Sequence, residues 1–273
     1  MENIRFVLIV ILAMISIMLW ETWQVDYGPK PAVIAETTID SNGNPITIES
    51  DNNPDTAELP FSENVADNII TVTTDVYQLE IDTQGGTLRN LDLQDYTVIK
   101  GEDAKIRLFN SSAEKLFLGQ SGLLTSGQST NLPNHNTELI SAQTSYQLKE
   151  GEDTLTVPLT WTDSSGISYT KTYTFTRGRY VIDLEQKVDN QSANDWTGRQ
   201  YTQLLRVPYS DGKGNTFIRT FAGAVVYTEE EKYQKIDFED MAQEDLKVMS
   251  VGGWSAMIQH YFATDWVPPA ANE

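Results

Sequence analysis

The sequence predicts an all-β domain, built as a sandwich of antiparallel sheets, that follows one transmembrane helix. The chain begins with an apolar, uncharged run and continues with a polar stretch rich in Asn, Asp and Pro. The remainder alternates between apolar and polar residues in short stretches that turn signals separate. We therefore divide it into an anchor at residues 1–23, a tether at 24–66 and a β domain at 67–273.

The composition excludes several classes of function. Lys and Arg number 19 against 39 Asp and Glu, which gives a formal net charge of -20 over 273 residues. Such a surface repels nucleic acid and anionic headgroups, which argues against a phosphate-reading role. The chain has no cysteine, which excludes disulfides, thiol catalysis and cysteine-based metal sites.

The first apolar run predicts a membrane anchor. No residue from Phe6 to Trp20 is charged, and the run reaches the short end of the length that a spanning helix needs. A cleaved signal peptide is the alternative, but its cleavage site requires small residues, which are missing after the run. Trp20 and Trp23 instead resemble an interfacial belt, one helical turn apart. The residues that we expect to hold the anchor in lipid are Phe6, Leu8, Ile11, Ile15, Leu19, Trp20 and Trp23.

The charges that flank the run predict its orientation. Arg5 and the α-amino group precede it, whereas Glu21 and Asp26 follow it. This asymmetry predicts that the N-terminus stays in the cytoplasm and that the rest of the chain is exported. The tether that comes next cannot bury enough apolar area to offset its ordering, so we expect it to lack regular structure.

Strand patterns begin after Ala66. The stretch DVYQLEIDTQGG places Tyr77, Leu79 and Ile81 on one face and ends in a Gly-Gly turn signal at 85–86. The clearest hairpin is TLTVPLTWTDSSGISYTKTYTFTRG, with its turn at 163–166 and one face made by Tyr169, Lys171, Tyr173 and Phe175. Further strands are predicted in RYVIDLEQKVDN, RQYTQLLRVPY and FIRTFAGAVVY.

Two later stretches are less regular. Residues 229–244 are highly charged and predict a short surface helix or an acidic loop. The stretch GGWSAMIQHYFATDWVPP fits a helical or a strand period. Its Gly-Gly start, its aromatic residues and its Pro-Pro end favour a single strand that is apolar on both faces and therefore central in a sheet.

No motif predicts a catalytic, cofactor or metal site. The two histidines, His135 and His260, are far apart in sequence and show no metal-ligand spacing. Ser121 lies in GQSGLLTSG, which lacks the glycine spacing of a hydrolase nucleophile turn. His260 could serve as the general acid of an aldose epimerase, but we favour the interpretation that it is a strand residue.

Several stretches together resemble a known family. These are the anchor ending in LWETWQ, a polar tether, VYQLEIDTQGGTLRNLDL, FAGAVVY, EEKYQKIDFED and GGWSAMIQHYFATDWVP. They resemble the N-terminal part of the YidC family of membrane protein insertases of Gram-negative bacteria. The resemblance covers essentially the whole chain.

The resemblance implies an inner-membrane protein whose periplasmic domain is a β-supersandwich related to galactose mutarotases. The family acts as an insertase and chaperone for nascent membrane proteins, alone or with the Sec translocon, without covalent catalysis or a cofactor. A groove with a buried arginine, among five later transmembrane helices, receives polar parts of the substrate. Because this chain stops at Glu273, we expect a fragment without that core and with a β domain incomplete at its C-terminus.

The resemblance also implies that the periplasmic domain touches accessory Sec components. The charged segment 229–244 is our candidate for this contact, with Tyr233 and Phe238 as its contact residues. The alternative function is a membrane-anchored periplasmic sugar-binding or mutarotase-like protein.

Overall fold

The computed structural model describes residues 14, 38–39, 45–46, 68–125, 133–208, 221–259 and 261–269. The chain separates into two compact units, Met1–Ile34 and Ala35–Glu273. Met14, in a helix, is the one described residue of the predicted anchor, so the seven predicted lipid-contacting residues lie outside the described part. Within the described residues, no helix is long and apolar enough to cross a membrane.

One short strand pair lies within the predicted tether. β1 (Thr38–Ile39) pairs antiparallel with β2 (Pro45–Ile46). We had expected no regular structure here, so this pair corrects that expectation. The sequence between the two strands contains Asn42-Gly43, a dipeptide that is typical of tight hairpin turns.

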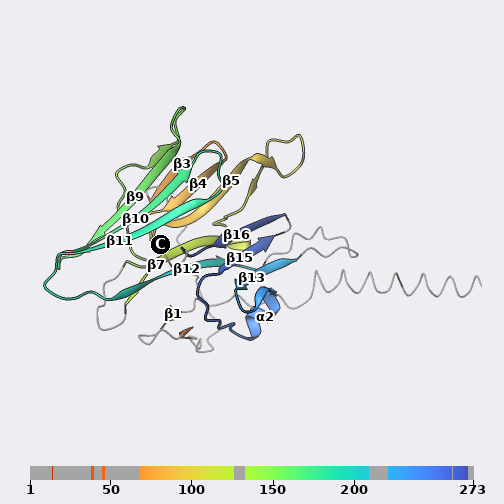
Figure 1. Cartoon of the computed structure of the whole chain (residues 1–273). Coiled ribbons are helices and arrows are strands. Elements are labelled where there is room, and N and C mark those ends of the chain that lie inside the picture. The colour runs from red at the N-terminus through yellow and green to blue at the C-terminus, as the bar shows by residue number, and fades with distance from the viewer. Residues whose placement is uncertain are drawn as a thin grey trace, which may run out of the picture. The chain divides into compact units, whose positions relative to one another are not determined.

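The largest sheet has seven strands in the order β12-β7-β5-β4-β3-β8, with β6 also paired to β5 (Figure 1). Its pairs are antiparallel except for the parallel pair of β3 and β8. A 3-10 turn, η1 (Ala113–Lys115), precedes β7. The strands are β3 (Ile69–Thr73), β4 (Tyr77–Asp82), β5 (Thr87–Thr97), β6 (Lys105–Arg107), β7 (Phe117–Thr125), β8 (Ser145–Gln147) and β12 (Gly198–Arg206).

A second sheet contains the predicted hairpin and one further strand. β9 (Thr154–Thr162), β10 (Ile167–Thr176) and β11 (Ile182–Asn190) form a meander with β10 in the middle. Asp163 forms the predicted turn between β9 and β10, because its Oδ1 accepts hydrogen bonds at 2.9 Å from the backbone N–H groups of Ser165 and Ile167. Gly166 completes this turn with a φ of 98°, which glycine adopts without strain.

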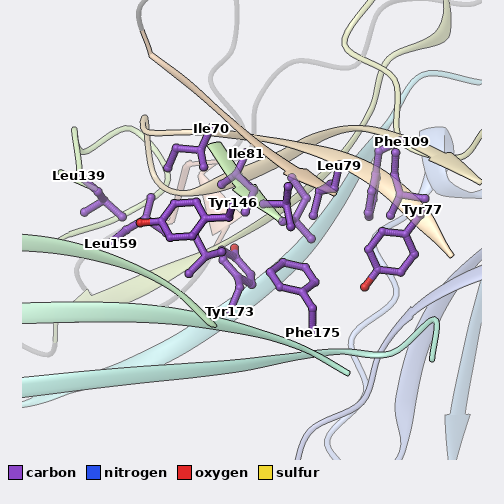
Figure 2. Close-up of a cluster of buried hydrophobic side chains, with 14 of the residues drawn as sticks. Ile70, Tyr77, Leu79, Ile81, Phe109, Leu139, Tyr146, Leu159, Tyr173 and Phe175 are labelled. Atoms are coloured by element: carbon purple, nitrogen blue, oxygen red, sulfur yellow. The ribbon is translucent and has the colours of Figure 1, made fainter. Parts of the chain in front are cut away.

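The core lies between these two sheets (Figure 2). Tyr173 and Phe175 of β10 point toward Leu79 and Ile81 of β4, and all four side chains are buried. Both faces that the alternation predicted, on β4 and on β10, therefore face this core. Because the regular elements of the described residues are strands apart from two short helical segments and Met14, the predicted all-β class is confirmed.

A four-stranded sheet completes the described fold, in the order β14-β13-β15-β16 (Figure 1). Its strands are β13 (Ala222–Thr228), β14 (Lys232–Ile236), β15 (Trp254–Gln259) and β16 (Phe262–Trp266), and α2 (Phe238–Gln243) follows β14. Val225 and Ala256 are its buried hydrophobic residues among those described.

The C-terminal stretch is a hairpin, so the prediction of one strand is wrong. β15 pairs with β16, and Gln259 lies opposite Phe262. β15 does lie between two strands, as a central strand should, whereas among the described strands β16 pairs with β15 alone. The reversal carries no Gly, Pro or Asn-Gly signal, so sequence pattern could not reveal it. His260 lies outside the described residues.

Candidate functional site

The segment predicted for partner contact, residues 229–244, contains a strand and a helix. β14 pairs with β13, and α2 begins at Phe238. Asp237 caps this helix, because its carboxylate accepts a hydrogen bond from the Asp240 N–H at 2.9 Å. The prediction of a surface helix or an acidic loop is thus right for α2 and missed β14. Lysine is depleted in strands, and it begins β14.

Tyr233 is the more exposed of the two predicted contact residues. It exposes 47% of its surface, whereas Phe238 is half-buried. The Tyr233 ring meets Trp254 edge-on, with 6.1 Å between centroids, and Trp254 stacks on Tyr227 at 5.8 Å and 8°. Gly253 allows this approach, since a Cβ there would lie 2.3 Å from the Tyr227 carbonyl oxygen. Trp254, which is itself stacked on Tyr227, therefore packs against one side of Tyr233.

The residues that follow α2 expose aliphatic side chains. Leu246 exposes 49% of its surface, Met249 98% and Val251 80%. The nearby sequence is acidic: residues 229–247 contain eight carboxylates (Glu229, Glu230, Glu231, Asp237, Glu239, Asp240, Glu244 and Asp245) and three lysines (Lys232, Lys235 and Lys247). We call residues 229–251 the β14–α2 segment. Exposed apolar groups among carboxylates suit a partner that offers apolar and basic groups.

His135 takes part in packing within the β domain. Its backbone N–H donates a hydrogen bond to the Tyr201 hydroxyl at 3.0 Å, and its Nδ1 lies 2.5 Å from the same oxygen. Burial raises the pKa of Tyr201 to about 12. On its other side, a Cβ on Gly85 would lie 2.3 Å from the His135 carbonyl oxygen. His135 thus connects the segment before β8 to β12 and to the Gly85–Gly86 turn.

The described residues offer no catalytic constellation. Ser121 lies inside β7 and is 1% exposed, so it cannot act as a nucleophile on a strained turn. Within the described ranges, no three His, Asp or Glu side chains converge as metal ligands would. The epimerase hypothesis for His260 concerns a residue outside those ranges.

Sequence reasoning missed a buried lysine in the core. Lys171 is 0% exposed, and its Nζ donates hydrogen bonds to the carbonyl oxygens of Gly85, at 2.5 Å, and Ser121, at 2.9 Å. The next inward residue, Tyr173, donates a hydrogen bond to the Gly86 carbonyl oxygen at 2.6 Å. The alternation had placed Lys171 among three aromatic residues, and that placement was the signal that could have revealed its burial.

Comparison with known families decides the assignment. Residues 69–273 match the family described as the YidC periplasmic domain. The chain belongs to the YidC family. The match covers every strand from β3 to β16 and includes the whole β14–α2 segment.

Relatives within the YidC family extend over the whole chain. A membrane protein insertase YidC of Methylococcus capsulatus is 46% identical over 100% of this chain. The corresponding proteins of Nitrosococcus oceani and Aeromonas salmonicida are 38% and 35% identical over 98% and 99% of it. In each case the chain covers 50% of the relative, so it spans about half the length of the curated relatives that it matches.

Proposed function

We propose that this chain is the N-terminal region of an inner-membrane insertase and chaperone that inserts and folds membrane proteins, alone or with the Sec translocon. The observation that carries the proposal is the similarity to relatives named membrane protein insertase YidC over the whole chain. We assign no enzymatic step and no cofactor to the chain. Its described residues would act through binding surfaces, not through covalent chemistry.

The proposed architecture has three parts. Residues 1–23 anchor the chain with the N-terminus in the cytoplasm, residues 24–66 form the tether, and residues 67–273 form the periplasmic domain. We propose that this domain is a β-supersandwich of the galactose-mutarotase type. The shared core of the seven-stranded and three-stranded sheets supports this proposal, as does the family match over 69–273.

The topology can be tested by reporter fusions. Alkaline phosphatase, which is active only outside the cytoplasm, is fused after Asp26 in one version and before Phe6 in another. We expect phosphatase activity from the fusion after Asp26 alone. A cytoplasmic reporter that is active after Asp26 would contradict the proposed orientation.

The function itself can be tested genetically. The gene that encodes this chain is read downstream of codon 273 and used, with everything that follows in frame, to complement cells depleted of their own insertase. We expect five further apolar segments, an arginine in the first of them, and restored growth. A stop codon after a completed sandwich, together with measurable anomer interconversion by the product, would favour the mutarotase-like alternative.

We also propose that the β14–α2 segment is where the domain contacts accessory Sec components. Tyr233 is exposed yet fixed by Trp254, so it presents an aromatic group whose loss of freedom on binding is small. The nearby exposed Leu246, Met249 and Val251 add apolar area. The carboxylates around them would select a partner with a basic surface.

Site-specific crosslinking tests this contact. A photoreactive amino acid replaces Tyr233, Phe238 or, as a control, the exposed Lys187 of β11. We expect crosslinks to a Sec component from the first two positions and none from Lys187. Equal yields from all three positions, or none from Tyr233 and Phe238, would contradict the proposed contact without affecting the insertase assignment.

A further inference from the structure

β10 places a lysine in the middle of the core. Lys171 lies between Tyr169 and Tyr173 on the inward face of this strand, and all three are buried. Its neighbours across the strand pairs are Leu159 of β9 and Gln186 of β11. The salt bridges among the described residues do not include Lys171. A buried ammonium without a carboxylate is costly, because its lost hydration is not replaced.

The hydrogen bonds of Lys171 match a neutral amine. Nζ has two acceptors, the carbonyl oxygens of Gly85 and Ser121, and a neutral amine has two N–H groups to donate. An ammonium has a third N–H. The ring of Tyr173 also lies near the amine, with its centroid 5.8 Å from Nζ. The Tyr173 hydroxyl is already used by the Gly86 carbonyl oxygen.

We propose that Lys171 is a neutral amine in the folded domain, and that its protonation weakens the packing of the three-stranded sheet on the seven-stranded sheet. Lys171 belongs to the three-stranded sheet. Ser121 lies in β7 of the seven-stranded sheet, and Gly85 lies in the turn between its strands β4 and β5. The two hydrogen bonds therefore connect the layers directly. This inference goes beyond the insertase assignment and does not depend on it.

The groups that face Lys171 do not supply a compensating charge. Burial raises the pKa of Tyr169 and of Tyr173, so both stay neutral. Leu159 is apolar, and Gln186 accepts a hydrogen bond from the Tyr169 hydroxyl at 2.6 Å. On the segment that packs behind the Gly85–Gly86 turn, the groups that titrate are directed elsewhere: His135 toward Tyr201, and the Glu138 carboxylate toward the Thr83 hydroxyl at 2.6 Å.

The pKa of Lys171 agrees with this geometry and determines whether stability rises or falls with pH. Burial lowers the pKa of Lys171 to about 7, whereas a lysine in an unfolded chain titrates near 10.4. Between these two values the unfolded chain binds one more proton, so stability rises with pH across that window and is lost as pH falls toward 7. The unfolding equilibrium constant then changes by up to about tenfold per pH unit.

The experiment measures the lysine and its linkage to folding in the full chain, held in detergent. Lysine side chains labelled with 13C at Cε are followed by NMR from pH 5.5 to 10. We expect one resonance to titrate near pH 7 and to be missing in Lys171→Met. Lysine resonances that all titrate together above pH 9 would overturn the proposal, and this result needs no variant that folds.

Urea unfolding at pH 7 and pH 9 provides the second readout. The wild type is compared with Lys171→Met, which keeps the length of the side chain, and with Lys187→Met, which removes an exposed lysine of β11. From pH 7 to pH 9 we expect the unfolding constant of the wild type to fall by about 10- to 100-fold relative to that of Lys171→Met. No such fall is expected relative to Lys187→Met. If the ratio of the unfolding constants of the wild type and Lys171→Met is the same at both pH values, the proposal is also overturned.

Discussion

β10 and β15 are both central strands, yet they differ in burial. β10 lies between β9 and β11 and buries Tyr169, Lys171, Tyr173 and Phe175. β15 lies between β13 and β16, but of its described residues Ala256 alone is buried. The difference comes from the second layer, because β10 faces the side chains of the seven-stranded sheet across the core. A central place in a sheet therefore satisfies the backbone hydrogen bonds of a strand, whereas burial of its side chains requires an opposing layer.

This difference predicts an uneven distribution of stability. Full burial of a large apolar side chain stabilises a fold by about 1.5–3 kcal/mol. The fully buried apolar side chains are concentrated between the seven-stranded and three-stranded sheets, whereas the four-stranded sheet contributes Val225 and Ala256. We therefore expect the four-stranded sheet to open more readily in local fluctuations.

The largest predicted effect compares one phenylalanine from each region. Phe175→Ala removes a side chain that is 0% exposed, so we expect it to lower the free energy of unfolding by about 3–5 kcal/mol. Phe262→Ala, in the half-buried start of β16, should cost less than half as much. Urea denaturation of the two variants measures the difference. Equal losses would show that the four-stranded sheet is as well covered as the core.

An intermediate effect is predicted at the glycines with positive φ. A Cβ on Gly151 would meet nothing within 4 Å, so Gly151→Ala carries the backbone strain of a φ of 85° alone, about 1–2 kcal/mol. A Cβ on Gly85 would lie 2.3 Å from the His135 carbonyl oxygen, and the Gly85 backbone is held by hydrogen bonds to Lys171 and Thr137. We expect Gly85→Ala to destabilise the domain at least twice as much as Gly151→Ala in thermal unfolding.

The substitution Gly253→Ala provides the same test in the four-stranded sheet. A Cβ there would lie 2.3 Å from the Tyr227 carbonyl oxygen, as close as the contact at Gly85. Because fewer buried side chains hold this sheet, we expect it to shift and Gly253→Ala to cost less than Gly85→Ala. The reverse order would contradict the proposed difference in rigidity.

The smallest effect concerns pH and the exposed turn at Asp163. Hydrogen bonds from the Ser165 hydroxyl and from the Ile167 backbone N–H lower the pKa of the Asp163 carboxyl group. Its stabilising contribution is therefore present above the unfolded pKa and lost as pH falls through the lower folded pKa. Asp163→Asn should lose less stability than the wild type on acidification below about pH 4. Asp195→Asn, in an exposed loop, is the control, and equal behaviour of both variants would contradict the prediction.

The local sequence pattern was sufficient to predict much of the core. The residues of β4 and the hairpin of β9 and β10 were predictable, because alternation and turn residues such as Asp163 and Gly166 act over a few positions. The inward face of β10 was also predictable. The hydrogen-bond partners of Lys171 were not predictable, because the two acceptors, at Gly85 and Ser121, are far away in sequence.

Short or charged elements escaped prediction for physical reasons. β8 has three residues and takes a parallel partner, β3, that is remote in sequence. β14 begins with lysine and follows three glutamates, so its strand character comes from pairing with β13. For the proposed partner contact, the sequence indicated Tyr233 and Phe238. The structure adds Trp254, which strand pairing places beside Tyr233, and Tyr227, which stacks on Trp254.

The pairing of β7 with β12 bears on the order in which the chain folds. β7 pairs along its full length with β12, from Gly198 opposite Thr125 to Arg206 opposite Phe117. Between them in sequence lie β8 and the meander of β9, β10 and β11, whose hairpin contacts are local and close quickly. In a chain that emerges N-terminus first, we expect the meander to form while β7 still waits for its partner strand. During that interval the edge of β7 is open to other chains, so the timing of β12 governs whether the domain folds or associates wrongly.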